Sequence, residues 1–237
     1  MVDYQCKSFY TVQDLPEIVR ILRGPGGCPW DREQTHESIQ RDFLEEVYEV
    51  LEAIERKDPA ALKEELGDVL LQVAFHTVLE DETGSLTLDD VADGVCKKLI
   101  YRHPHVFGDV TVSGTQEVLS NWEELKRVEK DQKTGADTME AVAKTLPALW
   151  RAQKVCKKAQ KAGHEWPVPN ALLDDLSAQV ERLRTAQDPQ TVLGDLLLTA
   201  ASLAHVLQTD AEVALSEATD RFIAAFRARE TGGQSAT

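Results

Sequence analysis

The chain has 237 residues and a formal net charge of −15, from 41 acidic and 26 basic residues. An acidic excess of this size argues against broad binding to nucleic acids or to anionic membranes. Hydrophobic residues make up 42% of the sequence, which is typical of a globular chain long enough for one large domain or two small ones.

The cysteines Cys6, Cys28, Cys96 and Cys156 are isolated and form no Cys-x-x-Cys pair. Their spacing fits neither a structural zinc site nor a disulfide framework, so we expect reduced thiols and a cytoplasmic location. The first residues lack the apolar core of a signal peptide, and no stretch of about 18 apolar residues predicts a membrane span.

Apolar residues recur three or four positions apart along the chain, which predicts helices. In the first half, the predicted helices cover residues 39–56, 62–79, 91–101 and 118–128. Pro59 suits the first turn of the second of these helices. The segment DVTVSG at residues 109–114 is expected to be a loop. The pattern therefore indicates an all-α fold.

The polar stretch at residues 130–138 is the best candidate for a domain boundary. We accordingly expect domains at residues 1–132 and 133–230, followed by a disordered tail at residues 231–237.

An internal repeat supports this division. The segment LGDVLLQVAFHTVL from Leu66 is echoed by LGDLLLTAASLAHV from Leu193. Weaker echoes pair GGCPWD with AGHEWP, FLEEVYEV with LLDDLSAQ, and KLIYR with RFIAA, all in the same order. Four echoes in register indicate duplication of a helical unit of roughly 100 residues.

Each of the first two predicted helices carries a pair of carboxylates three positions apart: Glu46 with Glu49, and Glu65 with Asp68. Residues at this spacing share a helix face, and a short connector makes the two helices antiparallel neighbours. Like charges about 4 Å apart repel by roughly 4 kcal/mol at an effective dielectric constant near 20. Four facing carboxylates therefore need protons or a cation, and oxygen ligands favour Mg²⁺ or Mn²⁺.

Solvated acidic helix faces are the alternative interpretation, because Glu is abundant and a spacing of three arises by chance. Asp68 argues against this alternative, since it opens the apolar segment at residues 69–79. A helix that is apolar around most of its circumference is usually buried, and a buried carboxylate needs a partner.

Lys98 and Arg102 lie four apart near the end of the third predicted helix. Two cations on one face suit phosphate, although a basic last turn also complements the helix dipole. Trp30 follows a Gly-rich turn; it could stack on a nucleotide base or fill the core.

Several motifs together resemble the MazG-type nucleoside triphosphate pyrophosphohydrolases: GGCPWD, LEEVYEVLEAI, EELGDVLLQVAF and KLIYRHPHVF. The acidic pattern of that family is Glu-Glu-x-x-Glu followed by Glu-x-x-Asp. Here the pattern falls on Glu45, Glu46, Glu49, Glu65 and Asp68. The resemblance is close over residues 10–130 and weaker to about residue 230.

The resemblance implies an all-α homodimer that depends on Mg²⁺, or on Mn²⁺ as a substitute. It implies hydrolysis of nucleoside triphosphates, ribo or deoxyribo, to the monophosphate and pyrophosphate, through water attack at the α-phosphorus. The metal would be held by Glu46, Glu49, Glu65 and Asp68. Glu45 and Glu49 would take part in catalysis, Lys98 and Arg102 would meet the phosphates, and Trp30 is the candidate for the base.

The second half departs from the family pattern. Asp174 and Asp175 stand where the paired glutamates should be, Ala178 and Val192 replace two further glutamates, and Asp195 remains. The loss of two ligands predicts that the first repeat is catalytic and that the second is a degenerate structural or dimerising remnant.

A Nudix hydrolase is rejected because Ala60 and Ala61 stand where its motif needs Arg-Glu, and Glu46 stands where it needs Gly. A non-catalytic acidic helical scaffold would show no Mg²⁺-dependent stabilisation. A pyrimidine-selective dNTP pyrophosphatase would keep the same chemistry with a narrower substrate range, and the sequence leaves that question open.

Overall fold

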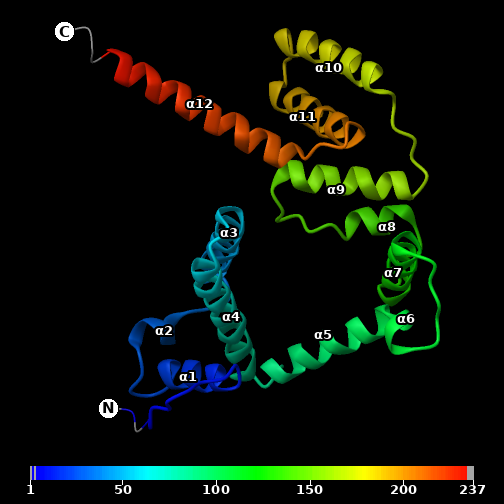
Figure 1. Cartoon of the computed structure of the whole chain (residues 1–237). Coiled ribbons are helices and arrows are strands. Elements are labelled where there is room, and N and C mark those ends of the chain that lie inside the picture. The colour runs from blue at the N-terminus through cyan, green and yellow to red at the C-terminus, as the bar shows by residue number, and fades with distance from the viewer. Residues whose placement is uncertain (1, 3, 234–237) are drawn as a thin grey trace. The chain divides into compact units, whose positions relative to one another are not determined.

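The computed structural model describes residue 2 and residues 4–233, and this part of the chain is helical without strands (Figure 1). The all-α prediction is therefore confirmed. The helices are α1 (Asp14–Arg23), α2 (Pro29–Glu33), α3 (Gln40–Arg56), α4 (Pro59–Asp81), α5 (Leu88–Arg102), α6 (Pro104–Phe107), α7 (Thr115–Glu129), α8 (Gly135–Glu140), α9 (Ala148–Lys161), α10 (Pro169–Arg184), α11 (Pro189–Val206) and α12 (Ala211–Gly233).

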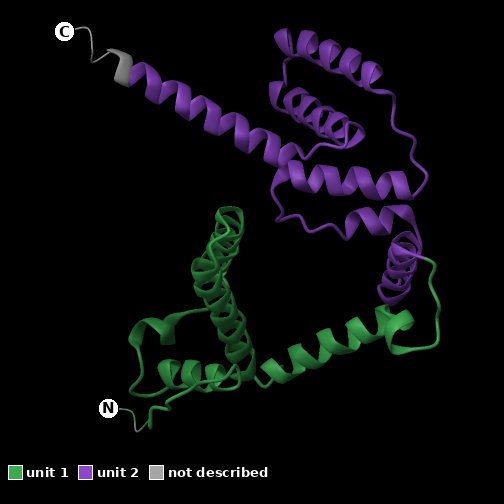
Figure 2. Ribbon diagram, viewed as in Figure 1, with its two compact units in different colours: residues 1–113 green, residues 114–237 purple. Residues whose placement is uncertain are grey.

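The helices form two compact units, residues 1–113 with α1–α6 and residues 114–237 with α7–α12 (Figure 2). The structural division falls before α7, whereas the sequence placed the boundary at residue 132. The assignment of two homologous domains stays a prediction. Helix α12 continues to Gly233, and the rest of the predicted tail lies outside the described residues.

The four helices predicted in the first half are present, each with slightly different ends. Helix α4 begins at Pro59 because the Asp58 side chain caps it, accepting hydrogen bonds from the amides of Ala60 at 2.9 Å and Ala61 at 3.2 Å. Lys57 ends α3 in a left-handed conformation with φ of 54°. This two-residue connection makes α3 and α4 an antiparallel hairpin.

Helix α1 packs on the C-terminal part of α4, and a small core there contains Val19, Ile39, Phe75 and Val78. Two arginines of α1 reinforce this contact. Arg20 donates to Asp81 at 2.7 and 3.0 Å, and Arg23 donates to Glu82 at 2.6 and 2.8 Å. The end of α4 is thus fixed, and its beginning faces α3.

The expected burial of α4 is correct only for its C-terminal half, where Ala74, Phe75, Thr77 and Val78 are buried. Leu66 and Leu70 in the first half are exposed. The apolar stripe of α3 is also largely exposed, and Ala53 is the one residue of that helix classed as buried. The single chain therefore leaves an apolar surface on the α3–α4 hairpin uncovered.

The second unit contains a comparable antiparallel pair, α10 and α11, on which α9 packs. Asp188 caps α11 by accepting from the amide of Thr191 at 3.3 Å, and Pro189 occupies the first turn. The buried side chains of Cys156 and Ser202 lie 3.5 Å apart where α9 meets α11.

All four cysteines are free, as the sequence predicted. Within the described residues, no single helix is long and apolar enough to cross a membrane. Two consecutive helical segments, Pro189–Val206 and Ala211–Glu230, reach the necessary length and apolar composition only when they are counted together. The angle between them is 107°.

Candidate metal centre between α3 and α4

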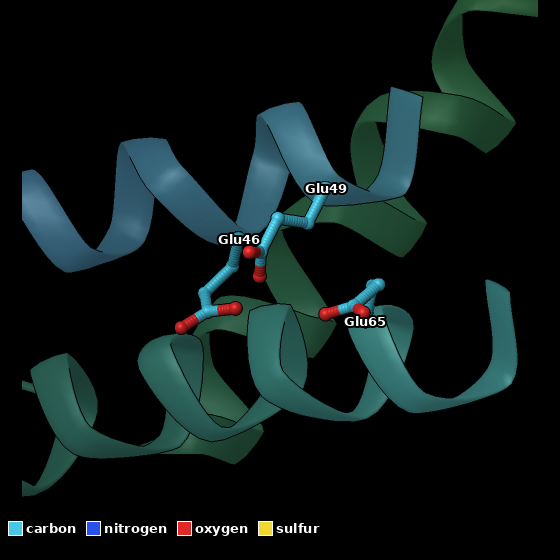
Figure 3. A group of neighbouring side chains, drawn as sticks. All are labelled: Glu46, Glu49 and Glu65. Carbon is cyan, nitrogen blue, oxygen red and sulfur yellow. The ribbon is translucent and has the colours of Figure 1, made fainter. Parts of the chain in front are cut away.

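Three of the predicted metal-binding carboxylates converge between two helices. Glu46 and Glu49 project from α3 toward α4, and Glu65 projects from α4 toward them (Figure 3). One oxygen atom of each side chain lies within 4.8 Å of the other two. The spacing of three residues on each helix, together with the short connector, accounts for this convergence.

The electrostatics of the group favour a positive charge at its centre. Burial, and then the charges of Asp68 and Glu49, raise the pKa of Glu46 above its ordinary value. Burial and the charges of Glu49, Glu64 and Asp68 raise the pKa of Glu65. A bound divalent cation would relieve this repulsion, and protons compete with such a cation as the pH falls.

Asp68 lies beside this group rather than inside it. It follows Glu65 by three residues on α4, is half-buried, and is close enough to Glu46 to raise the pKa of that carboxyl. It is not among the carboxylates whose oxygens meet within 4.8 Å. Its predicted role as a metal ligand therefore stays a prediction.

One uncharged side chain near the group is incompletely bonded. The Oε1 atom of Gln72, one turn after Asp68 on α4, is buried and has no hydrogen-bond partner. Gln72 follows Asp68 by four residues, so the two side chains share a face of α4. An unpaired buried acceptor of this kind calls for an explanation.

Glu45 points elsewhere on α3. It is exposed and lines a shallow depression of about 690 Å³ whose other lining residues are Arg41, Leu44, Tyr48, Glu49 and Glu52. Glu49 is thus shared between this depression and the carboxylate group. The proposed participation of Glu45 in catalysis is not tested by this arrangement.

The residues predicted to hold the substrate come from other elements. Lys98 is exposed on α5, Arg102 is buried at the end of that helix, and Trp30 is 59% exposed on α2. The contacts described for Lys98 and Trp30 do not join them to the carboxylates. Exposure of Trp30 excludes the core-filling alternative in this chain, and the three binding roles stay predictions.

A histidine pair near the same hairpin was not anticipated. His36 and His76 stack with ring centroids 5.0 Å apart, and their Nδ1 atoms are 2.7 Å apart. His36 Nε2 lies 3.0 Å from Glu80, and the ring of Phe43 packs against His76. The two histidines are 40 positions apart, so no local spacing could reveal their contact.

The fold and site together define an all-α protein whose antiparallel helical hairpin offers a carboxylate cluster suited to a hard divalent cation. The model of the MazG nucleotide pyrophosphohydrolase domain matches residues 34–107, which include α3, α4 and α5.

Relatives with known names extend this match over most of the chain. A nucleoside triphosphate pyrophosphohydrolase/pyrophosphatase MazG of Thermotoga maritima is 39% identical over 221 residues, which is 92% of this chain and 85% of the relative. A nucleoside triphosphate pyrophosphohydrolase of Escherichia coli K12 is 39% identical over 225 residues, covering 91% and 86% respectively. A protein of that name from Mycobacterium tuberculosis is 43% identical over 184 residues, covering 73% and 54%. The chain belongs to the MazG family.

Proposed function

We propose that this protein hydrolyses nucleoside triphosphates, ribo or deoxyribo, to the monophosphate and pyrophosphate in a reaction that requires Mg²⁺. The observation that carries the proposal is the convergence of Glu46, Glu49 and Glu65 within the segment that matches the family. The names of the relatives supply the substrate class.

The donor set fits a hard cation. It consists of carboxylate oxygens only, and burial with mutual repulsion raises the pKa of Glu46 and of Glu65. Such oxygens favour Mg²⁺, with Mn²⁺ as the substitute, over zinc. Asp68 completes the set in this proposal, because its charge already acts on Glu46.

Bound there, the cation would neutralise phosphate oxygens and lower the pKa of a water that attacks the α-phosphorus. In this proposal Glu49 orients that water, since its carboxylate is more exposed than that of Glu46. Glu45, one turn before Glu49, would take up the proton at the outer face of α3. Lys98, Arg102 and Trp30 are assigned to the phosphate chain and the base.

We also propose that two copies of the chain associate through the uncovered apolar surface of α3 and α4. Leu44, Tyr48, Leu51 and Ile54 on α3 are each about half exposed. Contiguous exposed apolar patches on a monomer are a mark of protein–protein interfaces. Light scattering after size exclusion should give twice the mass of the chain, and Leu51→Asp should shift the mass toward that of one chain.

The test of the activity is pyrophosphate release from a panel of NTPs and dNTPs, with Mg²⁺ and with EDTA. Wild type should release pyrophosphate only with the metal, and Glu49→Gln should lose most of the activity. Glu55→Gln, an exposed carboxylate on the same helix, is the matched control and should retain it.

The panel also separates the remaining alternatives. Release confined to dUTP and dCTP would establish the pyrimidine-selective enzyme. Absence of release from every nucleotide, with no effect of Mg²⁺ on the melting temperature, would leave the acidic scaffold. The cytoplasmic location stays a prediction.

A further inference from the structure

The unpaired oxygen of Gln72 is costly where it stands. Its Oε1 atom is buried with no hydrogen-bond partner, and no described contact is made by its amide nitrogen. A buried acceptor without a partner destabilises a fold by about 1–3 kcal/mol. An apolar side chain of the same shape would avoid that cost, so the amide requires another explanation.

The register of the hairpin places Gln72 beside Glu46. His76 of α4 packs against Phe43 of α3 with ring centroids 5.6 Å apart. Further along the hairpin, Glu65 meets Glu49. In an antiparallel pair, one turn from the Phe43–His76 contact toward the connector brings Gln72 of α4 to about the level of Glu46 of α3.

The second unit shows the corresponding contact directly. Thr199 follows Asp195 by four residues, as Gln72 follows Asp68, and Asp175 stands where Glu46 would be. The Thr199 hydroxyl lies 3.5 Å from the Asp175 carboxylate. Gln179 Nε2 donates to both of them, at 3.1 Å to Asp175 and 2.9 Å to Thr199. The two positions therefore face each other in this kind of hairpin.

We infer that Gln72 is a positioning residue of the metal centre, whose buried Oε1 is an acceptor for the hydrated divalent cation held by the carboxylates. This inference rests on the proposed function. Mg²⁺ usually keeps several of its water molecules in a protein site. Each of these waters has protons to donate, and a neutral amide oxygen accepts one without adding a further negative charge to a crowded site.

The first experiment compares wild type with Gln72→Leu in two measurements, the melting temperature without metal and the Mg²⁺ dissociation constant by calorimetric titration. Gln72→Leu should raise the metal-free melting temperature by about 2 °C, because the unpaired acceptor is gone. It should weaken Mg²⁺ binding by about tenfold, the size typical of losing a group that supports metal ligands.

Gln72→Glu keeps an oxygen at the same place and should bind Mg²⁺ at least as tightly as wild type. Gln179→Leu is the matched control, since Gln179 is a buried glutamine of the second unit whose Oε1 also lacks a hydrogen-bond partner, although its Nε2 is bonded. It should lower the melting temperature through the loss of the bonds to Asp175 and Thr199, and leave Mg²⁺ affinity unchanged.

The outcomes separate this inference from the proposal beneath it. If wild type binds Mg²⁺ and Gln72→Leu binds it equally well, Gln72 has no positioning role and the proposed function is unaffected. If wild type itself fails to bind Mg²⁺ or to release pyrophosphate, the proposed function fails, and the role of Gln72 fails with it. A Gln72→Leu variant with weakened binding and raised stability supports both.

Discussion

The hairpins α3–α4 and α10–α11 share the sequence signal that begins their second helix, but the polar contacts between their helices differ. Both second helices begin with an Asp cap and a Pro in the first turn, Asp58-Pro59 and Asp188-Pro189. Between α3 and α4, carboxylates face one another. Between α10 and α11, the side-chain amide of Gln179 instead donates hydrogen bonds to Asp175 and Thr199. An amide that donates two hydrogen bonds satisfies one carboxylate without a cation.

The lengths of the second helices explain part of this difference. Asp68 lies ten residues after its cap at Asp58, whereas Asp195 lies seven residues after Asp188. The three missing residues amount to almost one turn. Val192, which the predicted repeat aligns with Glu65, therefore falls in the capped first turn and is 8% exposed. The length of the second helix, as well as the identity of its residues, thus distinguishes the two hairpins.

The largest expected effect is the loss of nucleotide hydrolysis when one carboxylate of the α3–α4 hairpin is neutralised, compared with a similar change in the α10–α11 hairpin. Glu65→Gln should reduce kcat/KM for nucleotide hydrolysis by about 100-fold, as expected when a group that stabilises charge in the transition state is lost. Asp195→Asn, which removes the carboxylate that the second unit retains at the position aligned with Asp68, should leave kcat/KM within about twofold of wild type. Activity that survives Glu65→Gln and disappears in Asp195→Asn would place the catalytic site in the second unit.

Placing a glutamate at position 192 tests the argument from helix length. Val192→Glu buries an unpaired charge and should destabilise the protein by about 3 kcal/mol, measured by urea unfolding. Val192→Leu, which keeps the position apolar, should cost less than about 1.5 kcal/mol. Wild-type stability in Val192→Glu would show that the first turn of α11 has room for a carboxylate.

The contact between each hairpin and the helix packed on it should also contribute differently to stability. Arg23, whose side chain is 7% exposed, donates to Glu82 and to the carbonyls of Asp31 and Gln34. Arg23→Ala should therefore cost about 2 kcal/mol in thermal unfolding. Arg20→Ala removes the more exposed pair with Asp81 and should cost about 0.5 kcal/mol. Equal effects would mean that burial of Arg23 adds nothing.

In the second unit, His205 of α11 lies 2.9 Å from Gln160 of α9, and no ion pair joins these two helices among the described residues. Gln160→Ala should consequently change stability less than Arg23→Ala does. A larger loss in Gln160→Ala would show that α9 depends on this bond more than α1 depends on its arginines.

The smallest expected effect concerns pH. Burial, and then the charge of His36, lower the pKa of His76 below its ordinary value of 6.5. The unfolded chain therefore binds this proton more readily than the folded chain, and stability is lost as the pH falls below about 6.5. His76→Gln should flatten that loss in melting curves between pH 7.5 and 5.5.

In the other hairpin the predicted repeat aligns Leu203 with His76, and leucine has no proton to exchange in this pH range. Leu203→Ala is a control that should shift melting temperature equally at both pH values. If the melting temperature of His76→Gln falls with pH as steeply as that of wild type, protonation of His76 does not contribute to the loss of stability.

The sequence predicts what depends on neighbouring residues. The spacing of Glu46 and Glu49 and the Asp-Pro step before α4 are local, and both lead to features that the structure contains. The contact of His36 with His76 and that of Arg23 with Glu82 join segments far apart in the chain. No helical periodicity encodes these pairs, because they depend on how the elements pack.

The unpaired state of Gln72 was beyond sequence reasoning for a related reason. Spacing puts Gln72 on the face of Asp68, but only the structure shows that its oxygen is enclosed without a donor. The exposure of the apolar stripe on α3 is similar, since periodicity marks a face that will be covered but not whether the same chain covers it.

The two-residue connection at Lys57 and Asp58 has a kinetic consequence. Glu49 and Glu65 are 16 positions apart, so the site depends on contacts that are short in sequence. Closing a short loop costs little chain entropy, so we expect these contacts to form early in folding. A cation bound to carboxylates of both helices would then slow the local separation of α3 from α4. Exchange of amide hydrogens in α3 and α4 would be retarded by the ion, and exchange in α10 and α11 would proceed at its own rate.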